Sequence, residues 1–239
     1  MNKLKTNYRL NRYIAMCGVC SRRKADLLIK NGDIKINGKV VQELGYKVNT
    51  NDFVTFNGKQ IKIEKKRYIL LNKPRDYITT MSDERGRKTV VTLIKNSYKE
   101  RLVPVGRLDR NTTGLLLFTN DGDLTRTMSH PRFMVKKTYN IEIEKDLSPE
   151  HFEIIKSGVV LDDGVASIDE IKYLDKKNKI SIQLHIGRNR IIRRIFEHFN
   201  YKVLKLDRIQ FSIFTKKNLQ IGKWRKVTSH ELNQIKSLT

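Results

Sequence analysis

One aspartate flanked by two arginines forms the segment of this sequence best suited to chemistry. Asp109 lies between Arg107 and Arg110, and glycines at positions 106 and 114 bracket the segment. Opposite charges a few ångströms away favour the ionised form of a carboxyl group. An ionised aspartate in a loop beside a strand is suited to act as a nucleophile or a base. The plainer alternative is a turn aspartate, because Asp is common in loops.

A tyrosine in an alternating segment is the second candidate. Residues 137–144 alternate with period two, as a half-buried strand does, and they begin with Lys137-Thr138-Tyr139. A tyrosine in such a strand most often serves packing. The more specific interpretation is an aromatic face for a nucleic-acid base taken out of its stack, since this stacking contributes about 1–3 kcal/mol per base. Lys137 is then a phosphate contact, and Thr138 belongs to the scaffold.

A basic helix predicted over residues 188–199 is the third candidate. At about 100° per residue its isoleucines and phenylalanines share one arc, and Arg190 and Arg194 lie opposite. Arg193 lies at the border, where its stem can stay in the core while its head reaches a pocket. The alternative is a core helix with a solvated basic face, and both descriptions can hold together.

The overall charge predicts a polyanionic partner. Lys and Arg number 49 against 25 Asp and Glu, a formal net charge of +24. Such an excess repels itself, so nucleic acid is the first candidate partner and an anionic membrane the second. A membrane protein needs an amphipathic anchor or an apolar span of roughly 18 residues or more, and the sequence has no such span. Residues 1–7 lack the apolar core of a signal peptide, which predicts a cytoplasmic protein.

Cys17 and Cys20 are spaced as C-x-x-C, which can be half of a zinc or redox site. No second cysteine pair exists and no histidine is close in sequence. The pattern therefore favours two small packing residues, and we expect no metal.

The elements that must position these residues indicate two regions. In the more densely basic N-terminal quarter, Ser21 is a suitable N-cap for a helix that opens with Arg22-Arg23-Lys24. Three cations at a helix N-terminus oppose the helix dipole. The usual explanation is a solvated face, but the total charge favours a phosphate-contacting surface. Asn-Gly pairs at 37–38 and 57–58 predict two short hairpins.

The remaining sequence predicts an α+β domain around a mixed or antiparallel sheet, because many strands accompany few helices. Helices are expected near 90–94, from Ser148-Pro149, and after the capping box Thr228-x-x-Glu231. Strands are expected at 68–74, 102–105, 115–119, 137–144, 159–161, 167–173, 180–185 and 203–214.

Three motifs carry a resemblance to a known family. The block from Gly106 to Gly122, the Lys137-Thr138-Tyr139 segment and the run from Gly187 to Phe196 resemble the motifs of bacterial ribosomal RNA pseudouridine synthases. Residues 9 to about 54 resemble the small α-L RNA-binding module of several RNA-binding proteins. The likeness spans nearly all of residues 9–239.

This resemblance implies a reaction. Asp109 would be the nucleophile or base that breaks the N-glycosidic bond of a uridine, so that the detached uracil can turn and rejoin through carbon. Tyr139, Arg193 and Arg107 would bind the substrate, with Arg193 paired to the catalytic carboxylate. Arg188 and Arg190 would join the RNA contacts. No cofactor or metal is implied, because substrate and product are isomers. Relatives often have Gln where this chain has Ile191, so a hydrogen bond from that side chain is missing here.

We therefore expect an RNA-binding domain over residues 8–66 and a pseudouridine synthase domain over residues 67–239. The expected substrate is ribosomal RNA or a pre-ribosomal particle, with 23S favoured over 16S, and the expected state is a monomer without membrane or protein partners. The alternatives are the same chemistry on 16S or another RNA, a non-catalytic RNA-binding or ribosome-assembly protein, and a helix-turn-helix DNA-binding protein.

Overall fold

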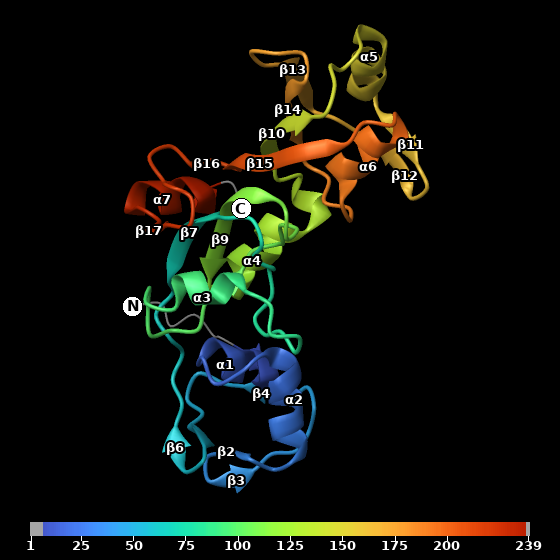
Figure 1. The fold of residues 1–239 in the computed structure, drawn as a ribbon. Helices are drawn as coiled ribbons and strands as arrows, with labels where there is room; N and C mark the ends of the chain where they lie inside the picture. Colours follow the sequence, from blue (N-terminus) through green and yellow to red (C-terminus); the bar gives the residue numbers. More distant parts are fainter. Residues whose placement is uncertain (1–6, 238–239) are drawn as a thin grey trace. The chain divides into compact units, whose positions relative to one another are not determined.

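The computed structural model describes residues 7–237. The chain divides into two compact units, and the boundary in the sequence lies between Arg67 and Tyr68 (Figure 1). No helix among the described residues is long and apolar enough to cross a lipid bilayer.

The first unit packs two helices against short strands. Its elements are β1 (Tyr8–Arg9), α1 (Leu10–Met16), α2 (Arg22–Lys30), β2 (Ile34–Ile36), β3 (Lys39–Val40), β4 (Lys47–Val48), β5 (Val54–Phe56) and β6 (Lys59–Gln60). The strands form an antiparallel sheet in the order β3-β2-β5-β6 and a separate β1-β4 pair.

Local signals explain how this unit forms. The Ser21 side chain accepts a hydrogen bond from the backbone of Lys24 and so caps α2. Both Asn-Gly pairs have positive φ at each residue, as the tight turns of two-residue hairpins require. Leu10, Ile14 and Ile29 are fully buried between the helices and the strands. The structure therefore has the two hairpins and the capped helix expected from the sequence.

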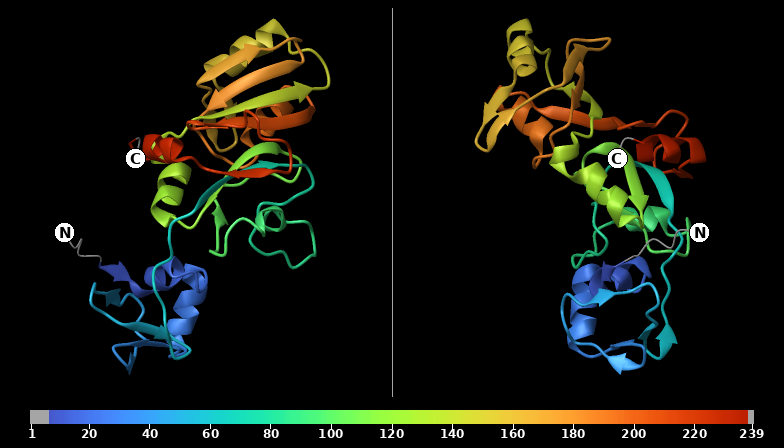
Figure 2. Two further views of the ribbon diagram at one scale, coloured as in Figure 1. Left: turned by 90° about the vertical axis from the view of Figure 1, so that its left-hand side faces the viewer. Right: turned by 180° about the vertical axis from the view of Figure 1, so that it is seen from behind.

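The second unit is built on a nine-stranded mixed sheet, in agreement with the predicted α+β class (Figure 2). Its main path runs β13-β14-β10-β15-β9-β7-β17, with β16 beside β15 and β8 beside β9. Strands β15 and β9 pair in parallel, and the other ladders are antiparallel. The strands are β7 (Tyr68–Lys73), β8 (Val103–Pro104), β9 (Thr113–Thr119), β10 (Lys137–Ile143), β13 (Glu170–Tyr173), β14 (Lys179–Leu184), β15 (Val203–Phe211), β16 (Phe214–Thr215) and β17 (Trp224–Lys226).

Helices cover both faces of this sheet. On one face lie α3 (Val90–Ile94), α5 (Pro149–Ser157) and α6 (Ile191–His198), and on the other lie α4 (Gly122–Ser129) and α7 (Ser229–Ser237). The centre is buried on both sides, because residues of β7 and β9 alternate between two apolar clusters. A separate hairpin joins β11 (Val159–Leu161) to β12 (Gly164–Ala166), and a 3-10 turn covers Pro131–Phe133.

Two sequence predictions need correction here. The basic helix begins at Ile191 rather than at Arg188, because Arg190 has a left-handed backbone with φ 47°. Helix α4 is absent from the elements expected from the sequence. It contains Gly, Asp, Thr and Ser, which are weak helix formers, and tertiary burial of Leu124 and Met128 supports it instead.

Candidate active site

Asp109 lies half-buried in the loop between β8 and β9. The loop enters from Gly106, whose φ of 73° suits glycine, and it turns where the backbone N–H of Thr112 donates to the carbonyl of Asp109 at 3.1 Å. Leu108, just before the aspartate, is 5% exposed and anchors the loop in the core. These contacts fix where the Asp109 carboxylate emerges.

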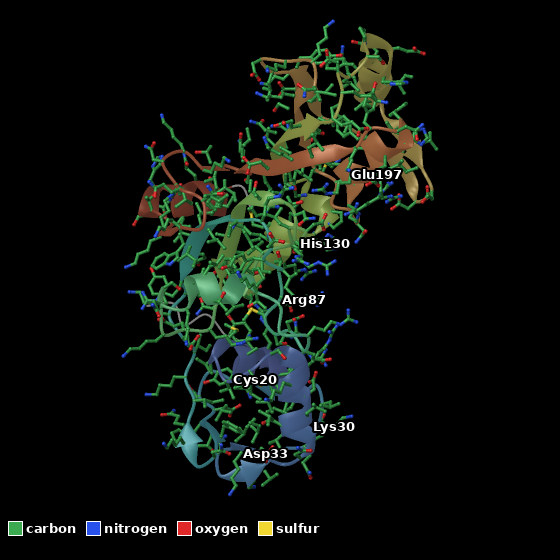
Figure 3. All side chains as sticks on the ribbon, in the orientation of Figure 1. Cys20, Lys30, Asp33, Arg87, His130 and Glu197 are labelled. Atoms are coloured by element: carbon green, nitrogen blue, oxygen red, sulfur yellow. The ribbon has the colours of Figure 1, made fainter. Side chains whose placement is uncertain are left out.

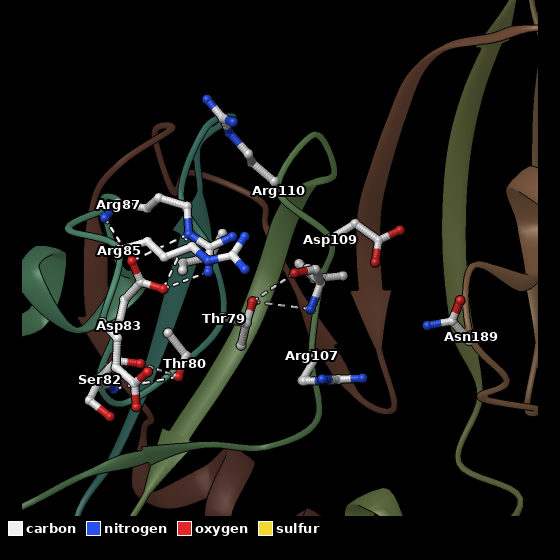
Figure 4. A pocket seen from close by; sticks show the side chains of 13 residues that line it. Thr79, Thr80, Ser82, Asp83, Arg85, Arg87, Arg107, Asp109, Arg110 and Asn189 are labelled. Atoms are coloured by element: carbon white, nitrogen blue, oxygen red, sulfur yellow. Dashed lines mark hydrogen bonds and ion pairs between the residues drawn. The ribbon is translucent and has the colours of Figure 1, made fainter.

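Two cavities open on either side of this loop. One, of about 310 Å³, brings Asp109 together with Tyr139, Leu206, Ile192 and the segment Gly187–Ile191. The three motifs found in the sequence therefore meet around one cavity. The other, of about 520 Å³, is lined by Asp109 and by residues of the 78–87 loop, in which Asp83 and Glu84 balance the charge of Arg85 and Arg87. Asn189 lines both cavities and faces Asp109 across the opening (Figure 4).

Tyr139 comes to this cavity from β10, where it pairs with Ile182 on one side and Arg208 on the other. The side chain is 8% exposed and packs in the larger apolar cluster. Its packing leaves the ring little freedom, so it can present a fixed aromatic surface to a base.

Arg193 contacts the loop that carries Asp109 through the loop backbone rather than through the Asp109 carboxylate. Its Nη1 donates to the Val203 carbonyl at 3.2 Å and its Nη2 to the Asn111 carbonyl at 3.5 Å. Within residues 7–237, no ion pair within 4.0 Å joins Arg193 to Asp109, and the buried Nε has no hydrogen-bond partner. Burial lowers the pKa of Arg193, as does the nearby Arg190, and Asp109 opposes that shift. The expected ion pair with Asp109 is therefore replaced by contacts that fix Asn111.

A buried lysine supports the same loop from beneath. Lys73, at the end of β7, is 0% exposed, and its Nζ donates to the carbonyls of Thr112 at 2.8 Å, Pro74 at 3.0 Å and Arg110 at 3.2 Å. Burial lowers the pKa of Lys73 to about 8, partly offset by Asp109. Sequence reasoning missed this residue, and the only signal for it is a lysine at the end of an otherwise apolar strand.

Two of the arginines expected to contact RNA are engaged with the protein. Arg188 donates to Asp163 at 3.3 Å and to the Gly164 carbonyl at 2.7 Å, both in the β11–β12 hairpin. Arg190 pairs with Glu197 at 3.0 Å. Arg107 lines both cavities and is exposed.

Lys137 also differs from its expected place. Its Nζ donates to the carbonyl of His185 at 2.8 Å, and burial lowers its pKa to about 8. The ammonium thus braces the segment that leads to Gly187, and this geometry does not favour the expected phosphate contact. In the first unit, by contrast, Arg22, Arg23 and Lys24 are all exposed at the start of α2.

Of the two cysteines, Cys17 is partly buried and Cys20 is buried. Cys20 is 8% exposed in the core of the first unit, at the place labelled in Figure 3. Burial raises the pKa of Cys17 to about 12, which keeps this thiol protonated. The described residues include no group of three His, Cys, Asp or Glu side chains that could hold a metal ion.

Comparisons with known proteins agree with this arrangement. A family model described as RNA pseudouridylate synthase matches residues 67–198, and one described as S4 domain matches residues 9–54. Ribosomal large subunit pseudouridine synthase B of Bacillus subtilis is 40% identical over 96% of both chains. An uncharacterized RNA pseudouridine synthase of Aquifex aeolicus is 42% identical over 95% of this chain and 93% of that protein. A crystal structure of a pseudouridylate synthase superposes with a TM-score of 0.68 at 24% identity, covering 97% of this chain and 99% of that one, which shows a shared fold.

Proposed function

Because this chain belongs to the RNA pseudouridylate synthase family, we propose that it converts one uridine of 23S ribosomal RNA to pseudouridine, with Asp109 as the catalytic group. The observation that carries the proposal is the meeting of Asp109, Tyr139 and the Gly187–Ile191 segment around one cavity. The B. subtilis relative, named for the large ribosomal subunit, supports the 23S target.

The bond changes follow from the proposed isomerisation of uridine. Uridine and pseudouridine are isomers, so the N-glycosidic bond breaks, the uracil turns, and a carbon–carbon bond forms without net oxidation or reduction. Asp109 attacks the nucleoside or removes a proton from it, and Tyr139 stacks on the extruded uracil while the base is detached. Arg193 and Lys73 hold the part of the loop that follows Asp109 by donating to the backbone carbonyls of Asn111, Arg110 and Thr112.

The two units are assigned different roles in this proposal. We propose that residues 8–66 bind RNA through the exposed cations of α2 and that residues 67–239 carry the reaction. Arg107, exposed beside the cavity, contacts a substrate phosphate. A ribosomal RNA substrate implies that the enzyme works in the cytoplasm.

Pseudouridine mapping tests the reaction and its target together. Ribosomal RNA is compared between cells with and without the gene by carbodiimide modification and reverse transcription. The deletion strain is complemented with wild type, Asp109→Ala, or Asp146→Ala, which removes an exposed carboxylate elsewhere. We expect one 23S stop to disappear on deletion and to return with wild type and Asp146→Ala only.

Other outcomes would change the conclusion. A lost stop in 16S RNA would keep the reaction and move the target. Unchanged 23S and 16S maps, with retained RNA binding by the purified protein, would favour a non-catalytic RNA-binding protein.

A further inference from the structure

We propose that Thr79, which no motif includes, is a positioning residue that orients Asp109 through the backbone of Leu108; the inference rests on the proposed function. The Thr79 hydroxyl donates to the carbonyl of Leu108 at 2.7 Å and accepts from its backbone N–H at 3.2 Å. Figure 4 shows both bonds beside the Asp109 side chain.

These two bonds restrain the peptide that carries the catalytic side chain. The carbonyl of Leu108 belongs to the peptide unit that joins Leu108 to Asp109, and peptide units are planar. Rotation of that unit would swing the carboxylate relative to Tyr139. With both polar backbone groups of Leu108 bonded to one hydroxyl, the rotation requires breaking a hydrogen bond in a partly buried site.

The other side of Asp109 is held independently. The carbonyl of Arg110 accepts from Lys73 Nζ at 3.2 Å and from the backbone N–H of Asp76 at 2.9 Å. The Asp109 backbone is therefore supported on both sides from one segment, residues 73–79. On the Leu108 side, the hydrogen bonds from that segment come from the Thr79 side chain.

Thr79 also lies at the base of the 78–87 loop. The backbone N–H of Ile78 donates to the carbonyl of Lys88 at 2.9 Å, and that of Val90 donates to the carbonyl of Ile78 at 3.0 Å. Inside the loop, Arg87 forms a 2.6 Å ion pair with Asp83. Arg85 and Arg87 line the larger cavity beside Asp109 (Figure 4). Thr79 therefore links the base of this loop to the backbone beside Asp109.

The expected signature is a slower reaction with unchanged binding. A displacement of about 1 Å in a reacting group can cost about 100-fold in rate. We therefore expect Thr79→Val, which keeps the shape and removes the hydroxyl, to lower the single-turnover rate on a 23S fragment about 10- to 100-fold. The dissociation constant for that RNA should stay within about twofold, because Thr79 donates to the protein and not to the substrate.

The neighbouring residue offers a matched control. Thr80 lines the same cavity, and its hydroxyl donates to the carbonyl of Ser82 within the loop at 2.7 Å. Thr80→Val should retain the wild-type rate within about threefold, and Thr79→Ser, which keeps a hydroxyl, should restore most of the rate lost in Thr79→Val. Thr79→Ala serves as a second test if the valine variant does not fold.

Three results would overturn the inference while leaving the proposed function intact. The first is a wild-type single-turnover rate in Thr79→Val and Thr79→Ala, and the second is an equal loss of rate in the Thr79 and Thr80 valine variants. The third is a loss of rate in Thr79→Val that is matched by an equal loss of RNA affinity. If the wild-type protein modifies neither the fragment nor total ribosomal RNA, the proposed function itself is wrong.

Discussion

Gly114 lies so close to the backbone of Arg208 that a Cβ at position 114 would be 2.3 Å from the Arg208 carbonyl oxygen. The two residues are partners in the parallel pairing of β9 with β15. Arg208 is 3% exposed, and its Nε donates to the carbonyl of Leu115 at 2.7 Å. The strand that follows the Asp109 loop is therefore joined to its neighbour by a close backbone approach that requires glycine.

Gly114→Ala should strongly destabilise the second unit. The new methyl group would overlap backbone atoms that cannot rotate away, and φ at this position is 106°. Overpacking and backbone strain together suggest a loss of about 2–4 kcal/mol in the free energy of unfolding. Urea unfolding followed by Trp224, the single tryptophan, reports on the sheet containing β17. Gly122→Ala is the control, because its new methyl group would meet no atom within 4 Å beyond its chain neighbours and its own helix backbone. It should change stability by no more than about 1 kcal/mol. Similar stability in both variants would show that the strands can separate.

Lys73→Met should destabilise the protein and remove a specific pH dependence. The substitution removes the Lys73 donor from three carbonyls, of which that of Arg110 keeps the backbone N–H of Asp76, and costs about 1–3 kcal/mol for each buried group that stays unpaired. The folded pKa of about 8 lies below the unfolded value of about 10.4. Between these values the unfolded chain binds more protons, so the contribution of Lys73 to the free energy of unfolding rises with pH. The stability difference between wild type and Lys73→Met should grow from pH 8 to 10 by at most about 1.4 kcal/mol per unit. A constant difference would mean that Lys73 titrates normally when folded.

The sequence was informative where short-range chemistry decides structure. Ser21 and Ser148 cap their helices as expected, because the capping bond spans only three residues. The motif segments around Asp109, Tyr139 and Asn189 were each visible as local patterns, and the structure brings them to one site.

The rest depends on contacts between residues that are distant in sequence. Thr79 and Leu108 are separated by 29 positions, and Arg194 and its partner Asp163 by 31. No periodicity links such pairs, so the support of the Leu108–Asp109 peptide and the engagement of Arg188 and Arg194 by the β11–β12 hairpin could not be foreseen. Likewise, a lysine buried to form three hydrogen bonds has the same sequence signal as one that merely ends a strand.

Tyr139 should contribute to base recognition through its ring. Tyr139→Phe keeps the ring and should keep the affinity for the 23S fragment. Tyr139→Leu keeps an apolar side chain in the core and should weaken substrate recognition by about 1–3 kcal/mol, measured as kcat/KM. A reduced rate with unchanged affinity in Tyr139→Phe would assign a further role to the hydroxyl. Equal behaviour of all three proteins would remove Tyr139 from the substrate site.

The exposed cations of α2 should determine much of the salt dependence of RNA binding. Each phosphate contact released contributes about 0.7–0.9 to the slope of log affinity against log salt, so replacing Arg22, Arg23 and Lys24 by Gln should flatten the slope by about 2–3. The same change removes three cations from a helix N-terminus, where they oppose the dipole, and should raise helix stability. Weaker binding would then reflect lost contacts rather than a damaged unit.

A charge-matched variant separates a specific surface from net charge. Lys35, Lys39 and Lys59 are exposed on the strands of the same unit, and their replacement by Gln removes the same total charge. If α2 carries the phosphate-contacting surface, this control should retain nearly the wild-type slope, because counterion release depends on cations that touch phosphates. Equal flattening in both triple variants would contradict a role for α2 and would attribute binding by this unit to its overall charge alone.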